Sequence, residues 1–117
     1  MGRLSGNELL GIGAQNRRRS VRVTIDIPVE VAYQGPDNEN LVQQARTLNV
    51  SAHGAALVVE NDVQFGQNVI VIHKRTREEV ACRVVSSRLI PKTTNIEVGV
   101  EFCKPMPSLW QITFPST

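Results

Sequence analysis

The longest regular pattern of hydrophobic and polar positions in the chain covers residues 21–34. Apolar side chains occupy every second position there, and the positions between them are mostly polar. Successive side chains of an extended strand point to opposite faces, so this alternation predicts a half-buried β-strand. Pro28 has no N–H to donate to a neighbouring strand, which either places the strand at a sheet edge or bends it at this residue.

Shorter apolar runs of the same kind follow along the chain, and turn residues such as those at 35–38 separate them. Further strands are predicted at residues 42–50, 55–60, 68–73, 79–89 and 96–103. Six short strands with almost no helical period between them are typical of an antiparallel barrel or sandwich. Because closure of the sheet removes exposed edges, we expect an all-β fold built as a six-stranded antiparallel β-barrel.

The two ends of the chain lie outside this pattern. Residues 1–16 have scattered glycines and no sustained period, which predicts a flexible leader before a barrel domain at residues 17–104. The tail at residues 105–117 contains three prolines, so it either stays irregular or holds a short helix within about residues 108–113. Its large apolar side chains are expected to cover one end of the barrel: Leu109, Trp110, Ile112 and Phe114. The alternative for the tryptophan is an interface with a partner protein.

Charge is unevenly distributed along the 117 residues, although the formal net charge is only +2. Residues 1–22 carry five arginines and one glutamate, a net +4, and residues 23–117 carry eight basic and ten acidic side chains, a net −2. A basic segment on a mildly acidic body favours a local anion site over a DNA-coating surface. No apolar run reaches the length of a membrane span, so we expect one cytoplasmic domain without membrane insertion.

The sequence contains no recognisable catalytic or metal-binding set. Cys82 and Cys103 are the only cysteines, and both lie in apolar strand-like runs. We therefore expect buried free thiols, with a disulfide between neighbouring strands as the alternative. His53 and His73 are too few and too isolated to hold a metal ion. Without a serine–histidine–aspartate or cysteine–histidine arrangement, we expect a non-enzymatic protein that needs neither metal nor cofactor.

Two short polar motifs, each at the end of a predicted strand, carry the functional signal. Arg18 and Arg22 lie at the start of the first strand, and Asn49, Ser51 and Gly54 lie where the second strand ends. An arginine fork binds a phosphate or the adjacent acceptors of a guanine with two parallel hydrogen bonds. On a strand, the amide and the hydroxyl would project from the same face, and the glycine would allow a left-handed turn or a close ligand. Together the motifs predict a site for a charged guanine nucleotide.

This pair of motifs resembles the signature of the PilZ domain family, which reads Arg-x-x-x-Arg and then Asp/Asn-x-Ser-x-x-Gly, and the resemblance covers residues 17–103. It implies a six-stranded antiparallel split barrel that binds the bacterial second messenger cyclic di-GMP. The same resemblance implies that Arg18 and Arg22 grip the ligand. Three neighbouring side chains extend the candidate site: Arg17, Arg19 and His53. The histidine occupies a free position of the motif, where an imidazole would crowd the nucleotide or stack on it.

We therefore expect a non-catalytic receptor in which ligand binding rearranges the arginine segment and signals to a downstream protein. The sequence does not identify that protein, and we expect the chain itself to be a monomer or weak dimer that does not bind DNA. The alternative is a barrel of the same fold that binds other proteins without any ligand. A binder of single-stranded nucleic acid is disfavoured because it needs aromatic stacking platforms, and the chain has one Trp, one Tyr and three Phe.

Overall fold

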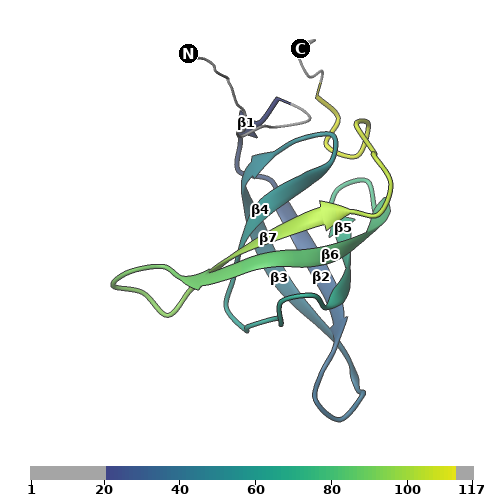
Figure 1. Ribbon diagram of the computed structural model, residues 1–117. Helices are drawn as coiled ribbons and strands as arrows, with labels where there is room; N and C mark the ends of the chain where they lie inside the picture. Colours follow the sequence, from purple (N-terminus) through teal and green to yellow (C-terminus); the bar gives the residue numbers. More distant parts are fainter. Residues whose placement is uncertain (1–20, 113–117) are drawn as a thin grey trace, which may run out of the picture.

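In the computed structural model of the protein, residues 21–112 are described, and they contain seven β-strands (Figure 1). In chain order they are β1 (Val23–Thr24), β2 (Pro28–Gln34), β3 (Asn40–Val50), β4 (Gly54–Val59), β5 (Asn68–His73), β6 (Glu79–Leu89) and β7 (Ile96–Phe102). The predicted leader at residues 1–16 lies outside the described residues. Within the described range, the structure has no helix with the length and hydrophobicity that a membrane span requires.

The sheet closes on itself in the order β3-β2-β5-β6-β7-β4, because β4 pairs with the second edge of β3. Every pairing is antiparallel. The short strand β1 also pairs with β3, next to the position where β2 leaves it. The prediction of an all-β, six-stranded antiparallel barrel is confirmed, with β1 as one additional strand. Closure removes the exposed edges that an open sheet of this size would leave.

The strand predicted at residues 21–34 is interrupted between β1 and β2, at residues 25–27. Thr47 of β3 bridges this break: its hydroxyl accepts a hydrogen bond from the Ile27 N–H at 2.9 Å and donates to the Ile25 carbonyl at 2.5 Å. Pro28 is the first residue of β2, which lies between β3 and β5. Of the two predicted consequences of this proline, the structure therefore shows the bend and not the sheet edge.

The barrel interior is filled by alternate side chains of its strands. In β2, for example, Val29 and Val31 are fully buried while the residues beside them are more exposed. The interior is dominated by β-branched and other aliphatic residues, which favour strands and pack tightly on a pleated surface. The largest fully buried aliphatic side chains of the barrel strands are Val29, Val31, Val50, Leu57, Val59, Val71, Val84 and Val98.

After β7 the chain folds back over the end of the barrel that carries β1 (Figure 1). The described part of this tail forms turns and no helix. Leu109 and Trp110 are buried in the hydrophobic core, and the indole packs on Phe102 with ring centroids 6.0 Å apart. The predicted cover of a barrel end is confirmed for these two residues, whereas Phe114 lies outside the described range. The alternative of an exposed interface at the tryptophan is wrong, because only 2% of Trp110 is exposed.

The two cysteines are both free, but they differ in environment. Cys82 points into the barrel, and burial raises the pKa of its thiol to about 12. Cys103 is exposed, so the prediction that both thiols are buried is wrong for this residue. The cause is that successive residues of a strand point to opposite faces. Cys82 lies opposite Phe102, and both are buried in the barrel. Cys103 follows Phe102 directly and therefore lies on the outer face, opposite Ala81.

Candidate functional site

The two predicted motifs meet where β1 pairs with the end of β3. Arg22 immediately precedes β1, and the pairs Val23↔Val50 and Thr24↔Asn49 fix its position beside β3. The guanidinium Nη1 of Arg22 donates a hydrogen bond to Oδ1 of Asn49 at 3.0 Å, in an exposed environment. The structure thus brings together one residue from each motif. Arg17, Arg18 and Arg19 lie outside the described residues.

A β-bulge in β3 turns Asn49 toward Arg22. The register of β3 against β4 shifts between Thr47 and Asn49, and the alternation of buried and exposed residues along β3 shifts at the same place. Thr47 is buried and Leu48 is exposed, but the next buried residue is Val50. In a regular strand Asn49 would share the inner face of Thr47, since alternate residues share a face. The bulge places the amide at the surface instead.

Ser51 has a different environment from Asn49. The serine is 5% exposed, and its hydroxyl accepts a hydrogen bond from the His53 N–H at 3.1 Å and lies 3.5 Å from the Gly54 carbonyl, to which it donates. The expectation that the amide and the hydroxyl project from one strand face is therefore wrong, because β3 ends at Val50. Of the two predicted uses of the hydroxyl, the structure shows the one that closes the turn between β3 and β4.

Gly54 is required by the approach of another strand. A Cβ atom at this position would lie 2.2 Å from the carbonyl oxygen of Val100 in β7. The glycine opens β4, and its φ is not among the positive values of the described residues. The predicted left-handed turn at Gly54 is therefore wrong, and the predicted approach of a ligand to its backbone stays a prediction. The residue allows β4 and β7 to pack closely at the end of the barrel that carries the motifs.

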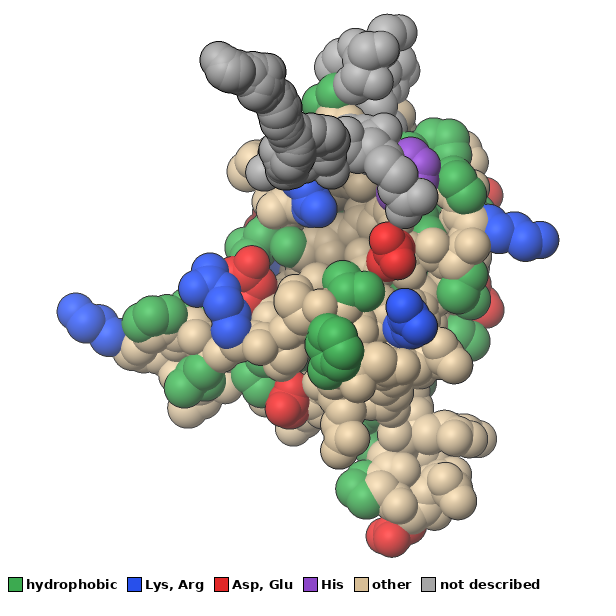
Figure 2. All heavy atoms as spheres, in the orientation of Figure 1, with side chains coloured by type: hydrophobic (Ala, Val, Ile, Leu, Met, Phe, Trp, Pro, Cys, Tyr) green, Lys and Arg blue, Asp and Glu red, His purple; other side chains and the backbone are tan. Residues whose placement is uncertain are grey.

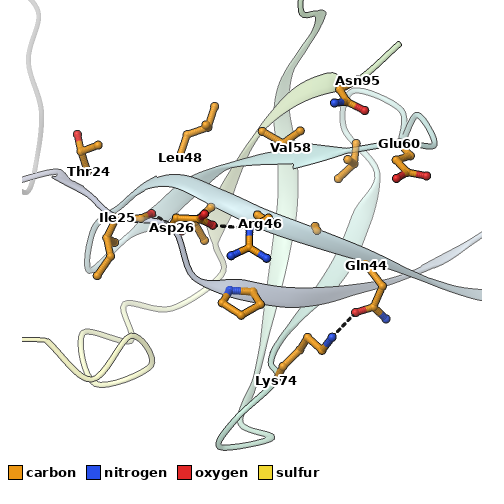
Figure 3. A pocket seen from close by; sticks show the side chains of 14 residues that line it. Thr24, Ile25, Asp26, Gln44, Arg46, Leu48, Val58, Glu60, Lys74 and Asn95 are labelled. Carbon is orange, nitrogen blue, oxygen red and sulfur yellow. Dashed lines mark hydrogen bonds and ion pairs between the residues drawn. The ribbon is translucent and has the colours of Figure 1, made fainter. Parts of the chain in front are cut away.

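A groove of about 760 Å³ lies beside β1 and β3 (Figure 3). Thr24, the strand partner of Asn49, lines the groove together with Leu48. Its wall carries side chains of both charges, including an ion pair of Arg46 with Asp26 at 2.7 Å. The volume lies within the range of pockets that hold small molecules.

The model of the PilZ domain matches residues 16–109. The chain belongs to the PilZ domain family. No curated protein matches this PilZ domain in sequence.

Solved structures share its barrel. The inhibitor of motility MotI (DgrA) from Bacillus subtilis has a TM-score of 0.60 and 22% identity over 83% of this chain. The PilZ domain of YcgR from Escherichia coli, solved with c-di-GMP, has a TM-score of 0.56 and 16% identity over 82% of this chain and 85% of its own. This PilZ domain spans 47% of the MotI chain and 42% of a longer YcgR chain solved with the same ligand. At these identities the likeness establishes the fold.

His53 differs from the other motif residues because one of its buried atoms has no partner. The imidazole Nδ1 is buried and forms no hydrogen bond within the described structure. The backbone of His53 is well held, since its N–H donates to Ser51 and its carbonyl accepts from the Phe102 N–H at 2.7 Å. The side chain therefore stands in the motif turn of this PilZ domain with an unused ring nitrogen.

Sequence reasoning missed the residues that hold this turn from outside. Trp110 and Met106, in the tail, bind the backbone carbonyls of Ser51 and Ala52. The apolar composition of the tail indicated that it covers a barrel end. No sequence pattern indicates which backbone carbonyl accepts the hydrogen bond of the Trp110 indole N–H. Within the described residues, no cluster of histidine, cysteine or carboxylate side chains has the geometry of a metal site.

The surface shown in Figure 2 carries basic and acidic side chains that are interspersed. Several of them neutralise one another on the barrel, as in the pairs of Arg88 with Glu97 at 2.9 Å and Arg77 with Glu30 at 3.3 Å. A hydrogen bond from Gln44 and, next to it, the charge of Arg77 lower the pKa of the Glu30 carboxyl. Among the described residues, the side chain of Arg22 binds the neutral amide of Asn49.

Proposed function

We propose that this PilZ domain is a receptor for cyclic di-GMP, which it binds at the surface formed by Arg22 and Asn49. The observation that carries the proposal is the 3.0 Å contact between these side chains, because it joins the two halves of the family signature in one place. Membership of the family and the likeness to the YcgR domain solved with c-di-GMP support the same ligand.

The chemistry of the pair suits a guanine nucleotide. The contact uses one N–H of the Arg22 guanidinium, and this side chain has five N–H donors in total. The remaining donors are available for a phosphate or for the O6 and N7 acceptors of guanine. Asn49 uses its side-chain carbonyl oxygen to hold Arg22 in place.

The other residues of the signature take supporting roles in this proposal. Arg18 supplies the second guanidinium, with Arg17 and Arg19 adding positive charge beside it. Ser51 and Gly54 act through the turn that ends β3 and not through direct contact with the nucleotide. The groove beside Thr24 and Leu48 extends the binding surface along β3.

We place the receptor in the bacterial cytoplasm, where its two free thiols remain reduced. It performs no catalysis and transmits ligand binding to a protein partner, since ordering the arginine segment changes the surface in front of β1. The charged ligand, and not a membrane or DNA, is the anion that the basic segment recognises.

The test is a calorimetric titration of the full chain with cyclic di-GMP, cyclic di-AMP and GTP, with the Arg18→Ala variant in parallel. We expect saturable heat from cyclic di-GMP alone and at least about tenfold weaker binding by the variant, since a good arginine–guanine fork contributes roughly 1–3 kcal/mol. Equal affinity for cyclic di-AMP would contradict guanine recognition. A folded protein that gives no heat with cyclic di-GMP would contradict the proposal as a whole.

One observation favours a second candidate, a domain that binds other proteins without a ligand. On the outer face, Ala32 of β2 lies between Val42 of β3 and Ile70 of β5, and the last two are 58% and 40% exposed. Apolar side chains in a row across three strands resemble the core of a protein interface. This candidate predicts that Val42→Lys abolishes association with a protein partner while cyclic di-GMP has no effect on that association. A partner released or recruited by the nucleotide would favour the receptor.

A further inference from the structure

Three successive backbone carbonyls of the motif turn are bound by the C-terminal part of the chain. The Trp110 indole Nε1–H donates to the Ser51 carbonyl at 3.0 Å, and this bond is buried. The Met106 N–H donates to the Ala52 carbonyl at 3.0 Å. The Phe102 N–H donates to the His53 carbonyl at 2.7 Å. We call these three hydrogen bonds the carbonyl clasp.

The clasp acts on the segment that presents Asn49. Ser51 follows Asn49 by two residues, and the turn that it begins is closed within itself by the Ser51 N–H bond to the Gly54 carbonyl at 2.9 Å. Within the described structure, β1 adds only two residue pairs to the end of β3. On its other edge the end of β3 pairs with β4, at Asn49↔Ala56 and Val50↔Ala55. Beyond Val50 the clasp holds the turn between β3 and β4, and the indole bond is its only side-chain component.

The tail, which supplies the Trp110 and Met106 bonds of the clasp, is itself firmly held. Leu109 is fully buried, and its N–H donates to the Met106 carbonyl at 3.2 Å. Gln111 accepts a hydrogen bond from the Arg75 guanidinium at 2.8 Å, which ties the tail to the hairpin between β5 and β6. A buried indole with a fixed ring partner, Phe102, loses little freedom when it holds the Ser51 carbonyl.

We infer that Trp110 is a positioning residue for nucleotide binding, which it supports by holding the Ser51 carbonyl so that Asn49 stays beside Arg22. This inference rests on the proposed function, because it describes how the same site is kept in its binding geometry. Trp110 does not touch the nucleotide. Removal of its N–H leaves the buried Ser51 carbonyl without that donor, so the turn loosens and the affinity of the site falls.

The first experiment compares Trp110→Phe with Val71→Ala in calorimetric titrations with cyclic di-GMP. The first variant keeps an aromatic ring against Phe102 and removes the N–H, while the second removes buried volume from β5, which pairs only with β2 and β6. Both variants should be less stable to urea. We expect the dissociation constant to rise about fivefold or more for Trp110→Phe, the worth of one buried hydrogen bond, and to stay within about twofold of wild type for Val71→Ala.

The second experiment needs no variant and uses the reciprocity of coupled equilibria. If the clasp supports nucleotide binding, then bound nucleotide supports the clasp by the same factor. We expect saturating cyclic di-GMP to slow hydrogen exchange about fivefold or more at the Phe102 and Met106 amides, which are two of the donors in the clasp. The Gly35 amide, bonded to the Glu39 carbonyl in the β2–β3 hairpin, is the control that should not change.

The outcomes separate the two proposals. Unchanged affinity in a folded Trp110→Phe variant would overturn the positioning role and leave the receptor intact. If that variant does not fold, unchanged exchange at Phe102 and Met106 in the saturated wild-type protein would overturn it equally. Equal loss of affinity in both variants would show that lost stability, and not the indole N–H, weakens the site. Absence of binding by the wild-type chain would overturn the receptor and this inference with it.

Discussion

The guanidinium of Arg22 and the amide of Asn49, which are 27 positions apart in the chain, lie 3.0 Å apart in the folded domain. Their contact depends on two local features, the two-residue strand β1 and the bulge that turns Asn49 outward. The candidate site therefore lies at the end of β3, where these two local features bring the two side chains together.

The acceptor of Asn49 provides a first prediction. Asn49→Ala removes the oxygen that holds Arg22, whereas Asn49→Asp keeps an oxygen there and adds a charge attractive to the guanidinium. We expect the alanine variant to bind cyclic di-GMP about tenfold more weakly and the aspartate variant to stay within about threefold of wild type. Fluorescence anisotropy with a labelled nucleotide measures both. Equal losses in the two variants would show that holding Arg22 is not the function of this oxygen.

The close approach at Gly54 provides a second prediction, on stability. In Gly54→Ala the new methyl group would lie 2.2 Å from the Val100 carbonyl oxygen, and neither backbone can move without breaking the pairing of β4 with β7. We expect a loss of about 1–3 kcal/mol in the free energy of unfolding by urea.

The matched control for this substitution is Gly99→Ala. Its methyl group would lie 2.4 Å from the Ser86 hydroxyl, a side chain that can rotate away. The control should therefore be the less damaging of the two substitutions. If Gly99→Ala proved the more destabilising, the explanation of Gly54 by backbone approach would be wrong.

His73 makes stability depend on pH. Burial, and next the charge of Arg75, lower the pKa of its imidazole from the ordinary value of 6.5. The folded state then binds fewer protons than the unfolded state. The contribution of His73 to the free energy of unfolding is therefore fully present above pH 6.5 and is lost as the pH falls through and below that value. The imidazole Nδ1 also accepts the Arg75 N–H at 3.2 Å, which protonation would prevent.

The variant His73→Asn tests this titration, because its oxygen can still accept that hydrogen bond but does not titrate in this range. Urea unfolding at pH 8 and pH 5 should show a smaller loss of stability at the lower pH for the variant than for wild type. An identical pH dependence would show that the imidazole of His73 is not responsible.

The two cysteines should react very differently with a thiol reagent. Cys103 is exposed, while Cys82 is buried with its pKa raised to about 12, so little of it is thiolate at neutral pH. Ellman's reagent at pH 8 should modify one thiol per folded chain and both in urea. Cys103→Ser is the control, which should show no fast reaction. Two fast-reacting thiols in the folded wild-type protein would contradict the burial of Cys82.

The fold was predictable from the sequence because the hydrophobic alternation is strong in nearly every strand. β5 and β6 agree with their predicted bounds, and the strict pattern of residues 21–34 placed the buried side chains of β2 correctly. The sequence indicated that Pro28 marks either a bend or a sheet edge. The alternation of apolar and polar residues does not distinguish these two possibilities. The choice depends on Thr47, a residue 20 positions from Ile27 that satisfies the backbone at the break.

The site was predictable only as a set of residues. The sequence indicated that Arg22 and Asn49 belong together, yet the outward turn of Asn49 depends on a bulge, which changes strand parity without any signal in the hydrophobic pattern. The same limit explains Ser51 and Gly54, whose roles follow from the turn and from β7. Cys103 was expected to be buried because it follows an apolar run, whereas the alternation in β7 places it on the face opposite to the buried Phe102.

The most direct test of the central claim is a double-mutant cycle in which wild type, Arg22→Ala, Asn49→Ala and the double variant are titrated with cyclic di-GMP by calorimetry. If the two side chains form one site, each single variant binds at least about tenfold more weakly and the double variant is scarcely weaker than Arg22→Ala. Additive losses would contradict a shared site. Affinity unchanged by Arg22→Ala would contradict the receptor mechanism itself.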